Sequence, residues 1–104
     1  MTAKQWKTLL RRQLKALGNT EKAYDSVVST LADILEQRDA VHEEYLADGC
    51  RPVREYTNKG GATNTVKNPL LVLWDDLNKS ALAYWRELGL TPSSYKKMTG
   101  DAPK

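Results

Sequence analysis

The single histidine, His42, is the first candidate for chemistry because acids stand close to it. Asp39 precedes it by three residues and Glu43 follows it directly. On a helix these groups would come near enough to one another to meet a metal ion. Zinc, however, needs three or four ligands that converge, and His42 falls within a row of apolar residues. We therefore predict a histidine in a helix interface, with no metal and no cofactor.

Other catalytic signatures are also missing. Cys50 is the only cysteine, which excludes an internal disulfide, and its thiol would need a neighbouring base to act as a nucleophile. The stretch Asn58–Gly61 lacks the spacing of a phosphate-binding Walker loop. One histidine without a nucleophile elbow does not make a serine-type triad. The sequence therefore predicts a protein that is not an enzyme.

Basic residues gather at the start of the chain. Between Met1 and Lys22 there are six basic residues and one acid, net +5, whereas Ala23 to Asp48 carry seven acids and one arginine, net −6. We predict DNA contacts from the basic residues of the leading stretch, which are Lys4, Lys7, Arg11, Arg12, Lys15 and Lys22. Most of them share one helix face, where they would bind phosphates without reading sequence. The alternative is a solvated basic face that binds nothing.

These side chains must be positioned by helices, because apolar residues recur every three or four positions over most of the chain. The first predicted helix covers Ala3–Leu17 and ends at Gly18. The second covers Glu21–Ala47, with Thr20 as its N-cap, and carries a heptad seam of apolar residues.

The pattern then changes from helix to strand and back. Val53 and Val66 stand on either side of a turn sequence rich in Asn and Gly, which predicts a β-hairpin. Asn68-Pro69 opens a third helix that runs to Leu88, and a short helical turn should follow. The predicted fold is mainly α: a short basic helix, a long heptad helix, a β-hairpin, a second long helix and a short C-terminal helical turn. We expect one domain over 1–104, divided into 1–22, 23–48, 49–67, 68–98 and a frayed tail, 99–104.

Two long apolar seams are more than a chain of 104 residues can bury by itself. We therefore predict a homo-oligomer whose interface uses the apolar and aromatic residues of these seams. The predicted interface residues are Leu31, Leu35, His42, Leu70, Trp74, Leu77 and Trp85. No apolar stretch approaches the length of a membrane span, so we expect no membrane partner and a reducing cytoplasm as the compartment.

The order of these motifs resembles the small subunit of phage terminase. A basic leading helix with Trp6, a long acidic helix, a short hairpin and a helix opening with Asn68-Pro69-Leu70 follow one another in that order. The most specific piece is the closing run from Glu87 to Ser93, Glu-Leu-Gly-Leu-Thr-Pro-Ser. The resemblance extends from about Lys4 to Met98.

The resemblance implies a non-catalytic DNA-recognition protein in the bacterial host cytoplasm. Such subunits form rings, bind the packaging-initiation site on double-stranded viral DNA and recruit the large subunit, which holds the ATPase and nuclease. We expect the hairpin to pack against another protomer or against that large subunit. We expect no separate, full-length DNA-binding domain ahead of the long helix, although a helix-turn-helix-like unit could form around Gly18-Asn19. Two other classes stay open: a dimeric helical DNA-binding regulator, and a helical adaptor without a nucleic-acid role.

Overall fold

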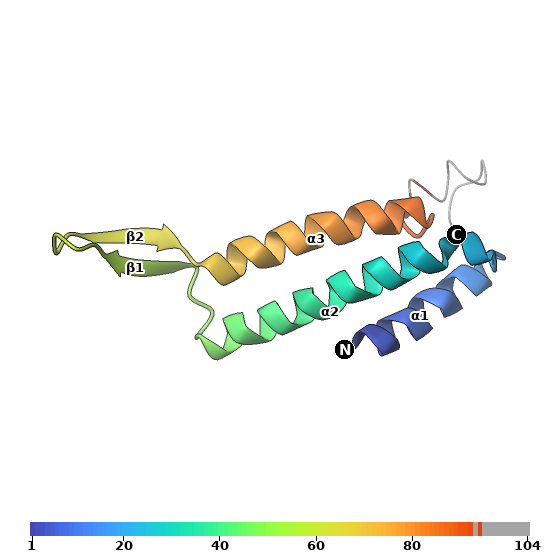
Figure 1. The fold of residues 1–104 in the computed structure, drawn as a ribbon, viewed down its shortest axis with the longest axis horizontal. Coiled ribbons are helices and arrows are strands. Elements are labelled where there is room, and N and C mark those ends of the chain that lie inside the picture. The colour runs from blue at the N-terminus through green and yellow to red at the C-terminus, as the bar shows by residue number, and fades with distance from the viewer. Residues whose placement is uncertain (93, 95–104) are drawn as a thin grey trace.

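The computed structural model describes residues 1–92 and residue 94 (Figure 1). Within these residues the chain forms three α-helices and one β-hairpin, in the order that the sequence predicts. The helices are α1 (Ala3–Ala16), α2 (Asp25–Ala47) and α3 (Pro69–Glu87), and the strands are β1 (Val53–Thr57) and β2 (Thr63–Lys67). Most of the predicted last helical turn and all of the predicted tail fall outside the described residues.

Helix α1 begins with a capping box. The hydroxyl of Thr2 accepts a hydrogen bond from the amide of Gln5, and the side chain of Gln5 accepts one from the amide of Thr2. These two bonds satisfy amides that a helix start otherwise leaves without partners. The helix ends before Gly18, whose φ of +78° is the left-handed conformation that a glycine C-cap supplies, so the predicted end is confirmed.

The start of α2 differs from the prediction. A short 3₁₀ helix, η1 (Lys22–Tyr24), precedes it, and α2 begins at Asp25 and not at Glu21. The predicted N-cap, Thr20, is wrong because the side chain of Asn19 accepts the amide of Glu21 and turns the chain there. Asn side chains that bond to the backbone two residues ahead make a turn of this kind.

Helix α2 is the centre of the fold. It packs against α1 on one side and α3 on the other, and each neighbour runs antiparallel to it (Figure 1). Helix α1 covers only the first half of α2, because its start already lies beside Asp39. The pairs Arg38–Asn78 and His42–Trp74 show that α3 continues along the second half.

The core is confined to the region where the three helices overlap. The fully or nearly buried apolar residues are Leu10, Leu14, Val28, Leu31, Ala32, Leu35, Ala81 and Leu88. Within α2 this core ends at Leu35, and within α3 it begins at Ala81. The other half of the α2–α3 pair therefore has only half-buried and exposed apolar side chains.

The hairpin extends from the far end of the α2–α3 pair (Figure 1). Strands β1 and β2 pair antiparallel, with Val53 opposite Lys67 and Thr57 opposite Thr63. The result is an elongated molecule of 60 × 27 × 22 Å. Its radius of gyration is 18.2 Å, whereas about 13 Å is expected for a compact domain of this length. Among the described helices, none is both long and apolar enough to cross a membrane.

Candidate nucleic-acid interface

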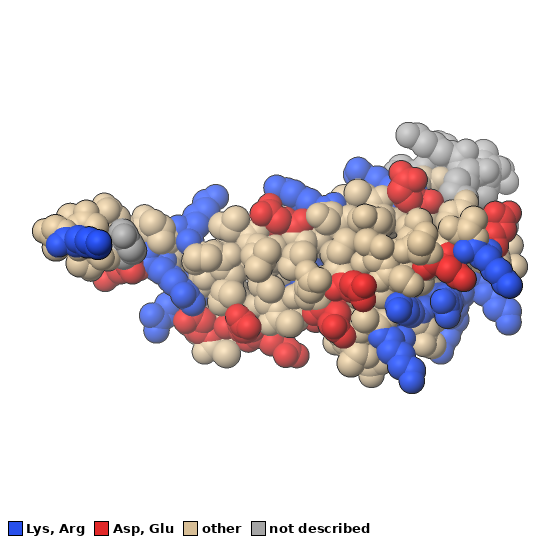
Figure 2. Space-filling model, viewed as in Figure 1, with Lys and Arg blue, Asp and Glu red and all other residues tan. Residues whose placement is uncertain are grey.

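The predicted DNA-contacting residues lie where the sequence analysis placed them, along α1 and just after it. Regular helical geometry brings Lys4, Lys7, Arg11 and Lys15 to one flank of α1, with Arg12 next to them. All of the six predicted residues are exposed except Lys7, which is half-buried. Figure 2 shows Lys and Arg side chains gathered at this end of the molecule.

Most of this positive charge is available to a ligand. Within the described part of the chain, the one ion pair made by these six residues joins Arg11 Nη2 to Asp25 Oδ1 at 3.8 Å. Both side chains of that pair are 57% exposed, and an exposed pair contributes little to stability. The flank can therefore meet phosphate oxygens without first breaking a strong contact.

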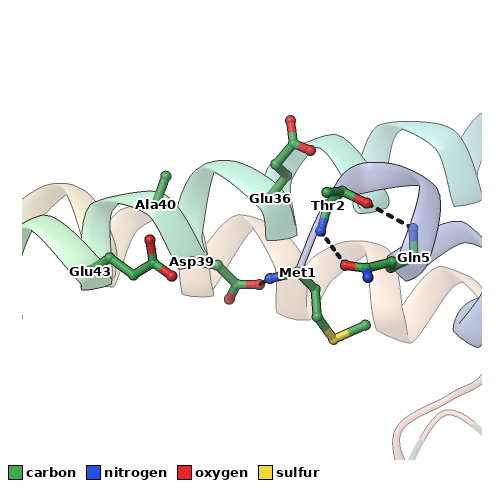
Figure 3. Close-up of a pocket in the computed structure, with 7 residues that line it drawn as sticks. All are labelled: Met1, Thr2, Gln5, Glu36, Asp39, Ala40 and Glu43. Atoms are coloured by element: carbon green, nitrogen blue, oxygen red, sulfur yellow. Dashed lines mark hydrogen bonds and ion pairs between the residues drawn. The ribbon is translucent and has the colours of Figure 1, made fainter.

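Acidic residues line the neighbouring edge of α2 (Figure 2). At the start of α1, Met1 and Thr2 meet α2 around a hollow of about 360 Å³. Its lining residues are Met1, Thr2, Gln5, Glu36, Asp39, Ala40 and Glu43 (Figure 3). The lining contains three carboxylates, which would disfavour a phosphate in this hollow.

Asp39 links α2 to α1 through several hydrogen bonds. Its carboxylate accepts the indole N–H of Trp6 at 2.8 Å, the amino terminus of Met1 at 3.2 Å and the guanidinium of Arg38 at 3.1 Å. The Arg38 guanidinium also lies over the Trp6 ring, 5.5 Å from its centre. Burial alone would raise the pKa of Asp39, but the hydrogen bonds from Trp6, Arg38 and the amino terminus outweigh burial, and the pKa is lowered.

The predicted interface residues separate into two groups. Leu31 and Leu35 are completely buried inside the single chain, so they belong to its core and have no exposed surface for another protomer. The second group lies on the partly covered side of the α2–α3 pair: Leu70, Trp74, Leu77 and Trp85 are half-buried, and His42 is exposed. The rings of His42 and Trp74 stack with their centres 5.4 Å apart.

Several exposed apolar residues were not among the predicted interface residues. Leu46 is 51% exposed, Leu73 47% and Val72 44%. All three lie at the end of the α2–α3 pair that carries the hairpin, beyond the core. Their positions on the helices could have been read from the heptad pattern, but the pattern alone does not say how far the third helix extends over α2.

A polar cluster at the base of the hairpin joins it to the end of α2 and the start of α3. The side chain of Asn68, which is completely buried, donates to Asp48 Oδ2 at 3.2 Å and to the carbonyl of Arg51 at 2.9 Å. Its side-chain oxygen accepts a hydrogen bond from the amide of Leu70, so Asn68 is the N-cap of α3. The hydrogen bond from Arg54 is the main cause that lowers the pKa of Asp48. The Asn68-Pro69 pair marks the helix start in the sequence, whereas no sequence pattern relates Asn68 to Asp48.

The described residues contain no group of three or more His, Cys, Asp or Glu arranged to hold a metal ion. Cys50 is exposed and has a φ of +56°, which is unusual for a residue with a side chain. Its amide donates to the carbonyl of Tyr45, and its own carbonyl accepts the Tyr45 hydroxyl. Cys50 therefore serves the turn out of α2.

A search of curated proteins and a search of solved structures gave no match. The model of a family described as "Phage terminase, small subunit" matches residues 2–104, which is essentially the whole chain. The chain therefore belongs to the family of phage terminase small subunits, which take part in viral DNA packaging.

Proposed function

We propose that this chain is the DNA-recognition subunit of a phage or prophage terminase. In this role it forms a homo-oligomeric ring without catalytic activity of its own, binds the packaging-initiation site on double-stranded viral DNA and recruits the large subunit. The family supports this assignment at the level of a terminase small subunit. The observation that carries the DNA-binding part is the exposed row of cations along one flank of α1.

The basic flank suits contact with the DNA backbone. Phosphate contacts fix the position of a protein on DNA and carry no sequence information themselves. An oligomer would repeat the flank once per protomer, and linked binding sites raise overall affinity well above that of one site. Modest contacts from each protomer would then be sufficient for stable binding.

The oligomeric part rests on the incomplete core. Between this core and the hairpin, the α2–α3 pair has no fully buried apolar residue among those described. This stretch consists of the residues after Leu35 in α2 and before Ala81 in α3, and it exposes Leu46 and Leu73. The exposed area of the chain is 7433 Å², whereas about 5,900 Å² is expected for a monomer of this mass. A protomer packed on this end would cover part of that exposed area.

Charge reversal on α1 tests the proposal. Arg11→Glu combined with Arg12→Glu should weaken binding to every duplex alike and reduce the slope of log affinity against log salt by about 2. The control, Lys79→Glu combined with Arg86→Glu, makes the same change in net charge on exposed residues of α3. Unchanged duplex binding by the α1 variant, with the oligomer mass preserved, would contradict the assignment of α1.

A further inference from the structure

Within the part of the chain that the structure describes, the β-hairpin has the fewest contacts with other elements. Every described side chain from Val53 to Lys67 is exposed. A two-stranded hairpin is at best marginally stable in water without a partner. Its surface is therefore expected to be covered when the protein works, and the chemistry of that surface indicates what covers it.

The surface is polar and basic on both faces. Residues 51–67 contain Arg51, Arg54, Lys59 and Lys67 but only one acid, Glu55. Arg54 is held by Asp48, whereas the other three cations form no ion pair within the described part of the chain. Threonine hydroxyls and one asparagine amide account for most of the remaining strand positions.

The described side chains of the hairpin form no apolar patch of the kind found at the centre of protein–protein interfaces. Its exposed apolar residues in the strands are Val53 and Val66, which are 47% and 44% exposed. Val53 pairs with Lys67, whereas Val66 pairs with Arg54, so the two valines lie on opposite faces. Pairing of one hairpin with that of a second copy would also bring like charges together.

We propose that the hairpin enters the major groove of duplex DNA and contacts base edges there. The major groove of B-DNA is about 12 Å wide and admits a two-stranded ribbon. Each strand has five residues, which gives an arm of roughly 17 Å. Threonine and asparagine side chains contact base edges in such grooves. The tip of the hairpin carries Lys59, a residue type that binds phosphate oxygens.

Hydrogen bonds within the chain close the hairpin at both of its ends. At the tip, the Asn58 side chain accepts the amides of Gly60 and Ala62, and Gly61 adopts a φ of +82°. At the base, the amide of Asn68 donates to the carbonyl of Pro52 at 3.0 Å. A binding element that is already ordered loses less conformational entropy on association. In this proposal the basic flank of α1 binds phosphates, and the hairpin at the opposite end of the molecule reads the major groove.

This inference rests on the DNA-binding part of the proposed function, and the experiment separates the two. The full chain is mixed with a mixed-sequence duplex several helical turns long. Three quantities are measured: hydrogen exchange of the hairpin amides, protection of guanine N7 from methylation, and affinity across salt. The variants are Lys59→Glu at the tip and Lys79→Glu on α3, which make the same change in charge.

We expect DNA to slow exchange in β1 and β2 and to protect guanine N7, which lies in the major groove. Lys59→Glu should lower affinity about tenfold and reduce the salt slope by about 1, while Lys79→Glu stays within about twofold of wild type. DNA binding without hairpin or N7 protection, and with Lys59→Glu equal to wild type, would overturn the inference and leave the proposed function intact. Protection of the hairpin by oligomerisation alone, lost in Lys59→Glu together with the oligomer, would assign it to a second copy. Failure of the wild type to bind any duplex would overturn both.

Discussion

The guanidinium of Arg54 donates two hydrogen bonds to Asp48 Oδ2, at 2.8 and 3.2 Å, and so ties the first strand of the hairpin to the end of α2. Asn68 donates to the same oxygen from the start of α3. One carboxylate thus fixes three elements in place. Because the hairpin has few other contacts with the helices, this cluster sets the direction in which it projects.

Loss of the Asn68 side chain should destabilise the protein more than its size suggests. Asn68→Ala removes the N-cap of α3 and leaves the carbonyl of Arg51 without its side-chain partner. We expect a loss of about 1–3 kcal/mol in the free energy of unfolding, measured by urea denaturation. Asn64→Ala, at an exposed position of β2, should change it by less than about 0.5 kcal/mol. Equal effects of the two substitutions would show that the cluster contributes nothing.

Stability should fall in acid because the pKa values of both Asp39 and Asp48 are lowered from the ordinary value of 3.8. A carboxylate with a lowered pKa in the folded state stabilises the fold above its unfolded pKa, and that stabilisation disappears as pH falls through the folded value. Urea denaturation should therefore show constant stability down to about pH 5 and a decline below about pH 4. Asp39→Asn should be less stable at neutral pH and decline less in acid. If Asp39→Asn loses as much stability in acid as the wild type does, Asp39 does not contribute to the acid sensitivity. Asp33→Asn, at an exposed position of α2, is the control.

Substitutions at two leucines should separate folding from assembly. Leu35 is completely buried, so Leu35→Asp should unfold the chain, and even Leu35→Ala should cost about 2–5 kcal/mol. Leu73 is 47% exposed, so Leu73→Asp should keep the helical circular dichroism and shift sedimentation from oligomer to monomer. If Leu73→Asp sediments as the wild type does, this end of α3 is not an interface.

The left-handed conformation of Cys50 should be relieved by glycine. Residues with a Cβ atom pay a steric cost at a φ of +56°. We expect Cys50→Gly to raise the free energy of unfolding by about 0.5 kcal/mol and Cys50→Val to lower it by about 1 kcal/mol or more. Thermal and urea denaturation of both variants measure this difference. Stabilisation by valine would mean that the turn changes its conformation.

Local patterns in the sequence were sufficient to predict the helices, the hairpin and the cations of α1. Capping residues and turn glycines act over a few positions, so Gly18 and Asn68 could be assigned without a structure. The contacts that join elements could not be assigned in this way. Trp6 and Asp39 are 33 residues apart, and no periodic pattern relates them.

The same limit explains the assignment of Leu31 and Leu35. A heptad seam shows that these residues face another helix, but it does not distinguish a helix of the same chain from that of a second protomer. Here α1 and α3 supply the cover, and the uncovered surface lies further along α2. The start of α2 was misjudged for a related reason, because Asn19 and Thr20 are both good capping residues and only one of them turns the chain.

The closed base of the hairpin has an evolutionary consequence. The amide nitrogen of Asn68 lies 3.0 Å from the carbonyl oxygen of Pro52, so the two ends of the hairpin are held together where it joins the helices. Two residues added to or removed from each strand would lengthen or shorten the arm and keep every side chain on its face, whereas a shift of one residue would exchange the faces. Natural selection can therefore alter the reach and surface of this arm in paired steps without repacking the helices.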